Sequence, residues 1–380
     1  EIVTRADGVP LYAEELARAA AEGLAERVPA TLHDLLAARL DALGEAKALA
    51  QRAAAVGREF DLGVLYRSLP GASALAERHL ARLEAAGLVE RLSPGRARFH
   101  HALVGEAAYL SLARGDRCAV HRAIADALAA DTSGEGAALL AHHRAAAGDA
   151  GAAIRAWLAA GQSATRQAAS REALVHFRSG LALLGELPEG AARAGLELEL
   201  QVGLGAAALA VDGYASTEGA AAYARAMALS GGEVDDGAGF AALWGLWASA
   251  SSRVGYDGAR DLADRLLEFG GRSGDPAHLL QAHFAVGDTA FWCGEFSRAL
   301  DALDHVERLW RPALHGRQVA ECGEDAGVTG AAYRSWVLWA LGRARDARDA
   351  SELSLARARE LGHPFSLAYA LTFAALLACR

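Results

Sequence analysis

Gly294-Glu295-Phe296-Ser297-Arg298-Ala299 places a glycine five residues before an alanine, and an apolar helical pattern follows. The same spacing recurs at Gly148 to Ala153 and at Gly342 to Ala347, with a looser version in Gly255-Tyr256-Asp257-Gly258-Ala259. Glycine ends helices readily, and small side chains let paired helices approach closely. The spacing therefore predicts stacked helical hairpins. A helical core without regular stacking is the alternative.

The hairpins have the spacing of irregular repeats. Gly255, Gly294 and Gly342 are 39 and 48 residues apart, whereas a tetratricopeptide repeat has roughly 34 residues. Several units end at a proline, Pro276 or Pro364. We therefore expect tetratricopeptide-like repeats with insertions, stacked into an α-solenoid.

Composition supports a mainly α chain and argues against several classes of protein. The 380 residues are 53% hydrophobic and 22% charged, with a net charge of −9. This balance lacks the overall positive charge of a protein that binds nucleic acid or anionic membrane. The four cysteines form no Cys-x-x-Cys pair, which favours neither a disulfide framework nor a zinc site and fits a reducing cytoplasm.

The longest uncharged runs, residues 237–252 and 363–379, are shorter than the roughly 20 residues of a membrane span. We expect both runs to be buried helices of the solenoid, and we expect no membrane partner. The chain begins at Glu1 without a methionine and finishes in an apolar helix. We therefore expect both ends to be truncated, as in a piece of a longer protein.

No catalytic motif is found in the sequence. A P-loop needs a lysine followed by serine or threonine, and the single lysine, Lys47, is followed by Ala48. His-Glu-x-x-His, Gly-x-Ser-x-Gly and Gly-x-Gly-x-x-Gly are absent as well. We therefore expect this chain to have no enzymatic activity of its own, no catalytic residue and no metal site.

Histidine and tryptophan pairs have ordinary structural interpretations. Neighbouring residues point in different directions, so His142 and His143 cannot easily bind one metal ion, and we expect structural or surface roles. Trp244 and Trp247 are three residues apart, as are Trp336 and Trp339. Each pair is expected to pack in the core.

The part of the chain from 31 to 112 predicts a winged-helix domain. Its expected order is three helices followed by a hairpin, which is the order of a winged helix. The first helix is expected to begin at Thr31, and the second to run from about Glu45 to Val56. The third helix is expected over 74–86, with Ser73 as its cap. The hairpin is expected to consist of strands 88–92 and 96–100 on either side of the Ser93-Pro94-Gly95 turn.

Charge argues against DNA binding by this domain. In the third helix Arg78 and Arg82 are balanced by Glu77 and Glu84. A helix that lies against phosphates would carry a larger excess of basic residues. We therefore favour a protein-packing role over DNA recognition.

A family resemblance covers essentially the whole chain. Gly8-Val9-Pro10-Leu11-Tyr12-Ala13-Glu14-Glu15-Leu16, with Val28-Pro29-Ala30-Thr31-Leu32 after it, resembles the lid region of bacterial STAND-type signal-transduction ATPases. Segments 99–104, 213–216 and 361–366 are similar to large regulators that join an ATPase module to a TPR-like C-terminal half. Those regulators are commonly fused to an adenylate/guanylate cyclase domain or to a LuxR-type DNA-binding domain.

The resemblance also implies nucleotide contacts. It places Gly8 and Pro10 against the adenine of the nucleotide, and it aligns His101 with the phosphate-sensing histidine in the Met-His-Asp motif of NB-ARC ATPases. Ala102 stands where that motif has its aspartate. An ordinary helix-start turn and a packing role for His101 are the alternatives. Since the P-loop is missing, ATP or ADP with magnesium belongs to the parent protein, and this fragment alone is expected to bind no cofactor.

These observations predict an organisation and a function. Residues 1–30 are expected to be the end of an ATPase lid region, and residues 31–112 the winged-helix domain. Residues 113–190 are expected to form the first helical hairpins, and residues 191–380 a truncated TPR-like α-solenoid. The expected function is that of a non-catalytic regulatory and protein-interaction region of a cytoplasmic, ATP-dependent signal-transduction protein. Its expected partners are the upstream nucleotide-binding domain and a protein or small-molecule inducer on the solenoid. A DNA-binding transcriptional regulator and a stand-alone TPR scaffold are the alternatives.

Overall fold

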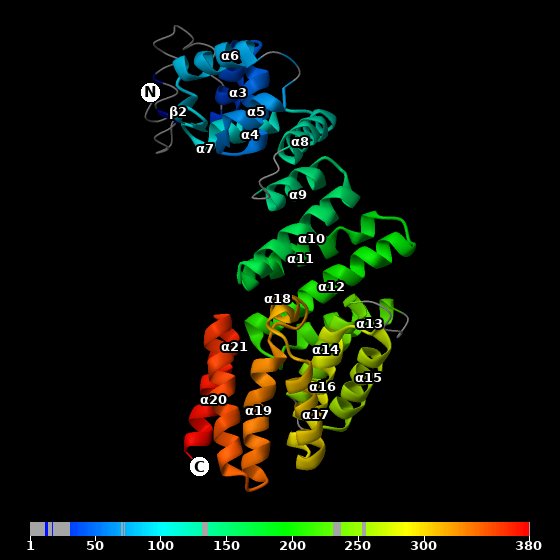
Figure 1. Ribbon diagram of the computed structural model, residues 1–380. Helices are drawn as coiled ribbons and strands as arrows, with labels where there is room; N and C mark the ends of the chain where they lie inside the picture. Colours follow the sequence, from blue (N-terminus) through cyan, green and yellow to red (C-terminus); the bar gives the residue numbers. More distant parts are fainter. Residues whose placement is uncertain are drawn as a thin grey trace. The chain divides into compact units, whose positions relative to one another are not determined.

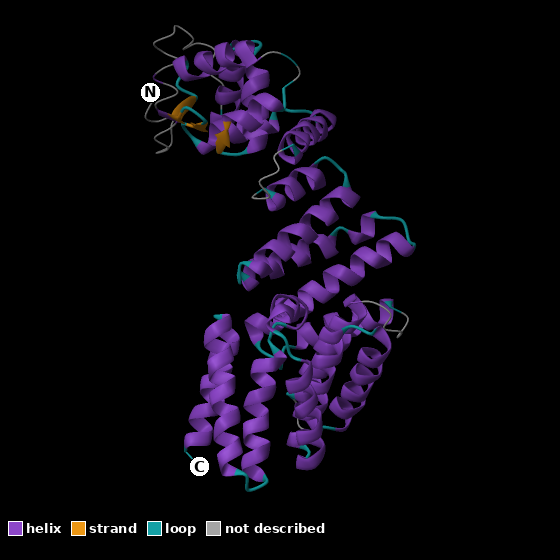
Figure 2. Ribbon diagram, viewed as in Figure 1, coloured by secondary structure: helices purple, strands orange, loops and turns teal. Residues whose placement is uncertain are grey.

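A computed structural model describes residues 12–13, 17, 31–69, 71, 73–130, 136–230, 237–252 and 256–379 of the chain. The chain divides into two compact units, Glu1–Ala156 and Trp157–Arg380, and the boundary falls inside one helix. Figure 1 labels the elements in chain order, and Figure 2 shows that the described strands lie in the first unit. The described chain is mainly α, as its composition predicts.

The first unit combines helices with a small antiparallel sheet whose strand order is β1-β3-β2. The three predicted helices and the hairpin are present, and the hairpin strands agree with the prediction to within a residue at each end, but the short helix Leu62–Arg67 between the second and third predicted helices was not predicted. The elements are α3 (Leu32–Ala42), α4 (Ala46–Val56), β1 (Glu59–Asp61), α5 (Leu62–Arg67), α6 (Ser73–Ala85), β2 (Val89–Ser93), β3 (Arg96–Phe99), α7 (Ala102–Leu110), α8 (Arg114–Ala129) and α9 (Ala137–Ala146).

Strand β1 was not predicted, because a three-residue strand has too few positions to show an alternating pattern. It forms by pairing with β3, with Phe60 opposite Ala97. The Phe60 ring then packs 5.6 Å from the ring of Phe99 in the core of the unit. The predicted start of the first helix is confirmed, since the Thr31 hydroxyl accepts a hydrogen bond from the backbone N–H of Asp34 at 3.1 Å.

The second unit is a succession of helices in which most helices pack against their neighbours in the sequence. Helices α16, α19 and α21 also pack on one another in turn, which is the stacking that defines a solenoid. The elements from the boundary helix onward are α10 (Ala150–Arg166), α11 (Ser170–Ala182), η2 (Leu184–Glu186), α12 (Ala191–Asp212), α13 (Thr217–Leu229), α14 (Gly237–Ser251), α15 (Asp257–Ser273), α16 (Pro276–Trp292), α17 (Phe296–Leu309), η3 (Pro312–Leu314), α18 (His315–Cys322), α19 (Ala326–Ala340), α20 (Ala344–Leu361) and α21 (Pro364–Ala378).

The three glycines of the recurring spacing take one conformation. Gly148, Gly294 and Gly342 have φ of +76°, +77° and +79°. In each turn the following residue donates its backbone N–H to the carbonyl five positions earlier, at 2.8 to 2.9 Å. The alanine five residues after each glycine is buried. Each glycine thus ends one helix, and each alanine packs the next helix against it, as the spacing predicts.

A fourth turn of this kind contains alanine in place of glycine and was missed in the sequence. Ala168 has φ of +56°, Ala169 donates its backbone N–H to the Ala164 carbonyl at 2.9 Å, and Ala173 five residues on is fully buried. This turn therefore has the same conformation and hydrogen bond as the other three, with alanine in place of glycine at the left-handed position.

Replacing Ala168 by glycine is expected to stabilise the second unit by about 0.5–1 kcal/mol, because an L-residue other than glycine is strained at positive φ. Urea unfolding followed by tryptophan fluorescence measures this change. Gly294→Ala, the reverse substitution in an equivalent turn, should destabilise by a similar amount. A destabilised Ala168→Gly variant would show that the left-handed turn carries no strain.

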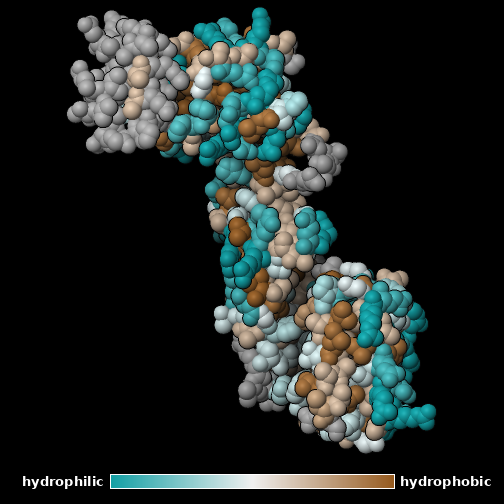
Figure 3. All heavy atoms as spheres, turned by 90° about the vertical axis from the view of Figure 1, so that its left-hand side faces the viewer, coloured by the Kyte–Doolittle hydropathy of each residue, from teal (hydrophilic) through white to brown (hydrophobic). Residues whose placement is uncertain are grey.

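Two predictions of burial are wrong. Helix α21, from the run 363–379, buries only Ser366 and Ala370, while Leu371 is 48% and Leu376 45% exposed. It packs on α19 and α20 along one side, and Figure 3 shows apolar residues at the surface of this unit. Trp339 is 42% exposed because the last turn of α19 lies at the surface. Trp336 does pack, with its ring stacked 4.4 Å from that of Phe373.

One described helix, α12, is long and apolar enough to cross a membrane by length and composition alone. Its apolar residues have a role in packing between helices, since α12 lies against α11 and α13. Leu200 meets Gly180 of α11, and Gly205 meets the ring of Tyr223 in α13. Close packing between helices therefore buries part of this apolar helix.

Candidate functional site: an acid–tyrosine cluster in the helical repeats

Gly8 and Pro10, the predicted adenine contacts, lie outside the described residues. His101 is described. It is exposed, lies two residues after the end of β3 and occupies the N-cap position of α7 without a side-chain capping bond. Its ring centroid lies 6.3 Å from that of His100. The structure therefore presents the His101 imidazole at the surface of the first unit, and its predicted contact with a phosphate stays a prediction.

The most unusual chemistry in the described chain is a pair of buried carboxyl groups in the second unit. Asp288 lies on α16 and is 4% exposed, and Glu324 lies in the turn before α19 and is 3% exposed. No lysine, arginine or histidine among the described residues forms an ion pair with either carboxyl. Their hydrogen-bond partners are neutral, Tyr333 and Trp292 for Asp288 and Thr329 for Glu324, and a buried carboxylate without a cation is costly.

Three tyrosines surround the two acids. Tyr214 comes from the turn between α12 and α13, Tyr333 from α19 and Tyr369 from α21. Tyr333 hydrogen bonds to Asp288, and Tyr214 and Tyr369 both lie within electrostatic range of the two carboxyls. We call Asp288, Glu324 and these three tyrosines the acid–tyrosine cluster.

Burial shifts the titration of every member of the cluster. Burial, with the neighbouring Asp288 and Asp325, raises the pKa of Glu324 to about 8. Burial raises the pKa of Asp288 to about 6, against the lowering effect of its hydrogen bond with Tyr333. Burial also raises the pKa of the three tyrosines well above 10. At pH 7 the coupled acids therefore share about one proton, and the phenols are neutral.

Two buried glutamines, on α16 and α18, have side-chain polar atoms without a partner among the described residues, although Gln318 Oε1 accepts from the backbone N–H of Ala326 at 2.8 Å. Gln281 is 1% exposed, and neither its amide oxygen nor its amide nitrogen has a hydrogen-bond partner among the described residues. It precedes Asp288 by seven residues, so both side chains lie on one face of α16. Gln318 of α18 is 2% exposed, and its Nε2 is also without a partner in the described chain.

Helix α18 belongs to the insertion that the 48-residue interval predicts, and it packs on α14 and α16. Arg317 holds it there. Its Nε donates to Glu321 at 2.7 Å, its Nη2 lies 3.2 Å from His278 Nε2, and its Nη1 pairs with Asp275. The Trp244 indole N–H donates to the backbone carbonyl of Cys322 at 3.2 Å. The insertion is therefore fixed against the start of α16, on the side of Gln281.

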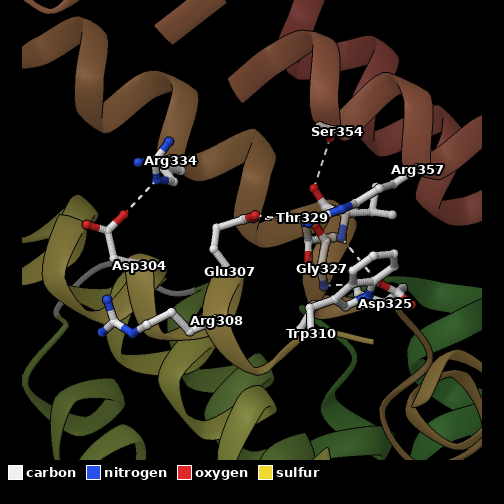
Figure 4. Close-up of polar contacts among 12 residues, drawn as sticks. Asp304, Glu307, Arg308, Trp310, Asp325, Gly327, Thr329, Arg334, Ser354 and Arg357 are labelled. Carbon is white, nitrogen blue, oxygen red and sulfur yellow. Dashed lines mark hydrogen bonds and ion pairs between the residues drawn. The ribbon is translucent and has the colours of Figure 1, made fainter. Parts of the chain in front are cut away.

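The turn that carries Glu324 is fixed by its neighbour, Asp325. The fully buried Asp325 accepts hydrogen bonds from the backbone of Gly327 at 2.9 Å and from the Trp310 indole at 3.0 Å, and His315 Nδ1 lies 2.9 Å from its other oxygen. Figure 4 shows Trp310, Asp325 and Arg357 together at this turn. Asp325 is thus satisfied by the fold, and Glu324 beside it hydrogen bonds with Thr329.

Arg357 closes the other side of this turn. Its guanidinium lies 4.0 Å from the centre of the Trp310 ring and donates to both carboxylate oxygens of Glu307, at 2.8 and 2.9 Å. It also donates to the Gly327 carbonyl at 2.9 Å. Helices α17, α19 and α20 are joined by this one arginine, which makes the turn before α19 a rigid support for Glu324.

Sequence reasoning missed the acid–tyrosine cluster, although signals for it exist. Asp288 is the only charged residue in the otherwise uncharged stretch 276–294 apart from histidine, and an acid within such a helix is expensive. The 48-residue interval indicated an insertion but not where it folds. Gly213-Tyr214-Ala215-Ser216 was quoted for its family resemblance, and the structure places Tyr214 in the cluster.

The histidine pair 142–143 separates into two environments. His142 is exposed, while His143 is fully buried with its Nδ1 2.7 Å from Nδ1 of His121. His121 Nε2 lies 2.8 Å from the Tyr109 hydroxyl. Burial, with the neighbouring imidazoles, lowers the pKa of His143 to about 3. This contact between neutral imidazoles joins α8 and α9, and no sequence pattern points to His121. The described residues contain no group of three or more His, Cys, Asp or Glu side chains placed to hold a metal ion.

Comparison with known proteins gives a distant set of relatives. No protein-family model matches the chain. An uncharacterized protein of Rhizobium meliloti (strain 1021) is 26% identical over 393 aligned residues, which cover 96% of this chain and 37% of that protein. This chain therefore spans little more than a third of the length of the curated relative it matches.

Two solved structures show weaker likeness. One is a signal transduction ATPase with numerous domains (STAND) with a tetratricopeptide repeat sensor, from Pyrococcus horikoshii. It is 12% identical with a TM-score of 0.45, and the match covers 98% of this chain and 59% of that one. The other is NprR in complex with its cognate peptide NprX, 11% identical with a TM-score of 0.45, where the match covers 78% of each chain.

Proposed function

We propose that this chain is a non-catalytic regulatory and protein-interaction region of an ATP-dependent signal-transduction protein. The single observation that carries the proposal is the acid–tyrosine cluster within stacked helical repeats. Buried acids that no described cation neutralises lower stability, and proteins retain such groups where function needs them. Scaffolds of stacked repeats bind partners on extended concave surfaces.

The first unit would relay the nucleotide state of an upstream domain. Its helices α3 to α6, the hairpin and the following helix α7 fit a winged-helix relay, and the exposed His101 is free to meet a phosphate in another domain. The balanced charges of α6 favour protein packing, since Glu77 and Glu84 pair with Arg91 of β2 at 2.5 and 3.1 Å. ATP or ADP with magnesium would be bound by the parent protein in the cytoplasm, with Gly8 and Pro10 against the adenine.

An effector on the repeats would act through its differential affinity for two states of the parent protein, one closed and ADP-bound and the other open. The resemblance of the lid and of segments 99–104, 213–216 and 361–366 to STAND-type regulators supports this assignment. A cyclase or a LuxR-type domain would then be the output.

The proposal is tested on the full coding sequence. A Gly-x-x-x-x-Gly-Lys-[Ser/Thr] motif upstream of Glu1 is expected, and the full protein should hydrolyse ATP at a rate that His101→Ala changes. Asp288→Asn should alter the response of that rate to effector-containing cell extract, while Glu268→Gln, an exposed acid on α15, should not. Hydrolysis of ATP by the 380-residue chain alone, above a heat-killed control, would contradict the proposal, as would a full protein without a P-loop.

A further inference from the structure

The insertion between α17 and α19 is a loop that is closed at its base. The Trp310 indole N–H donates to the Asp325 carboxylate at 3.0 Å, and the Arg357 guanidinium lies over the Trp310 ring. Residues 311–324 between them fall within the roughly 6–16 residues of compact surface loops whose ends meet. His315, the first residue of α18, also bonds to Asp325 and so lies at this base. The rest of α18 can therefore leave its place while the base of the loop stays closed.

Few side chains of the insertion are buried. The short helix η3 buries none, and among the described side chains of α18 only Gln318 is buried. Leu314 and Cys322 reach the core of the second unit only in part. The Cys322 carbonyl accepts one hydrogen bond, from Trp244 of α14. Because apolar burial contributes little here, polar contacts hold much of the insertion in place.

One arginine makes most of the polar contacts between α18 and α16. Arg317 bonds to Glu321 on its own helix and reaches Asp275 and His278 at the start of α16. Glu321 Oε2 also lies 3.2 Å from His278 Nε2. The Arg317 side chain is 44% exposed, so a competing molecule can reach it. Arg317 therefore acts as the latch of the insertion.

The surface beneath α18 is polar and incompletely satisfied. His278 is 4% exposed, and its Nδ1 has no hydrogen-bond partner among the described residues. Gln281, three residues further on and so on the same face of α16, has no described partner for either amide atom. Buried polar groups in folded proteins almost always have partners. The fit of α18 to this surface is therefore incomplete.

We propose that the surface of α14 and α16 beneath α18 is a docking site for a short helical segment of a protein or peptide effector, and that α18 occupies it as an autoinhibitory strap. The segment that fits has the chemistry of α18 itself, an arginine followed four residues later by a glutamate. Its arginine bonds to Asp275, and its glutamate lies beside His278. The inference rests on the proposed function for the effector, whereas the strap stands on the contacts of the insertion.

Hydrogen exchange of the 380-residue chain tests the strap. In the wild type, the amide hydrogens of α18 should exchange together with those of α16. In Arg317→Ala, which lacks the latch, they should exchange at least about tenfold faster, while α16 and α19 stay protected. Glu321→Gln, a change within the strap, should act in the same direction. Arg272→Ala, at an exposed arginine on α15, is the matched control and should leave α18 unchanged.

Binding of the strap sequence as a separate peptide tests the docking site. The probe is a fluorescein-labelled peptide of residues 311–323 with Cys322→Ser, followed by fluorescence anisotropy. It should bind the Arg317→Ala chain at least about tenfold more tightly than the wild type, whose tethered strap competes at high effective concentration. The same peptide with Arg317→Ala should bind neither chain. Asp275→Asn keeps an oxygen for the helix cap and should weaken binding to the Arg317→Ala chain.

Equal binding of the probe to the wild type and to Arg317→Ala, or binding to neither, would overturn the proposal. So would α18 amides that stay as protected in both Arg317→Ala and Glu321→Gln as in the wild type. If the strap is released in these variants while Arg317→Ala leaves ATP hydrolysis by the full protein unchanged, the strap stands and the proposed function fails.

Discussion

Replacing Glu324 by glutamine is expected to raise the free energy of unfolding by about 4–5 kcal/mol at pH 8 and by only about 1 kcal/mol at pH 5. The pKa of this buried carboxyl is raised to about 8 in the folded chain, against about 4.3 when unfolded. The folded state therefore holds a proton that the unfolded state releases between these values. The contribution of Glu324 to the free energy of unfolding is therefore fully present below its unfolded pKa. It is lost as the pH rises toward its folded pKa, at about 1.4 kcal/mol per pH unit.

Urea unfolding of the wild type and of Glu324→Gln at pH 5, 6.5 and 8 measures this difference. Tryptophan fluorescence reports the second unit alone, because all seven tryptophans lie between positions 157 and 339. Asp288→Asn should show the same trend with a smaller rise, since the pKa of Asp288 is raised only to about 6. Glu268→Gln is the matched exposed control. A difference between Glu324→Gln and the wild type that does not grow with pH would mean that Glu324 is solvated.

Gly203→Ala is expected to destabilise the second unit by about 2–3 kcal/mol through overpacking. A Cβ atom at Gly203 of α12 would lie 2.5 to 2.9 Å from the ring of Phe177, which is 1% exposed. Gly161 of α10 also lies against this ring, since its added Cβ would lie 2.4 Å from it. The ring is therefore closely packed by two helices.

Phe177→Leu should rescue the Gly203→Ala variant in a double-mutant cycle, because the smaller side chain removes the clash. Gly195→Ala on the same helix is the control, since nothing lies within 4 Å of an added Cβ there. It should stabilise by about 0.5–1 kcal/mol through helix propensity. Urea unfolding midpoints give all four values. Equal effects at Gly203 and Gly195 would show that helices α10 to α12 are not packed this closely.

The helical architecture could be predicted from the sequence because it depends on local signals. Glycine at the end of a helix and alanine five residues later act within one turn, and they identify the hairpins at Gly148, Gly294 and Gly342. Ala168 escaped notice because its left-handed conformation is imposed by the surrounding helices and not by its own preference. The short strand β1 is likewise a product of pairing with a distant segment.

The acid–tyrosine cluster could not be predicted in the same way. Its members come from five separate segments between Tyr214 and Tyr369, and no spacing along the chain links them. Asp288 and Glu324 are 36 residues apart in the sequence, and only the folded insertion brings α18 and its following turn over α16. His101, in contrast, was found through family resemblance, and the structure adds that it is exposed at a helix start.

Helix α18 changes how the repeats are expected to lose structure. In a regular solenoid each repeat contacts only its neighbours, so the end repeats can open one by one. Here the insertion is bonded to α14 through Trp244 and to α16 through Arg317, across separations of 78 and 39 residues. Helices that are far apart along the chain are therefore expected to unfold together. Amide hydrogens from α14 to α19 should then exchange with solvent through one cooperative opening, with the same free energy of opening.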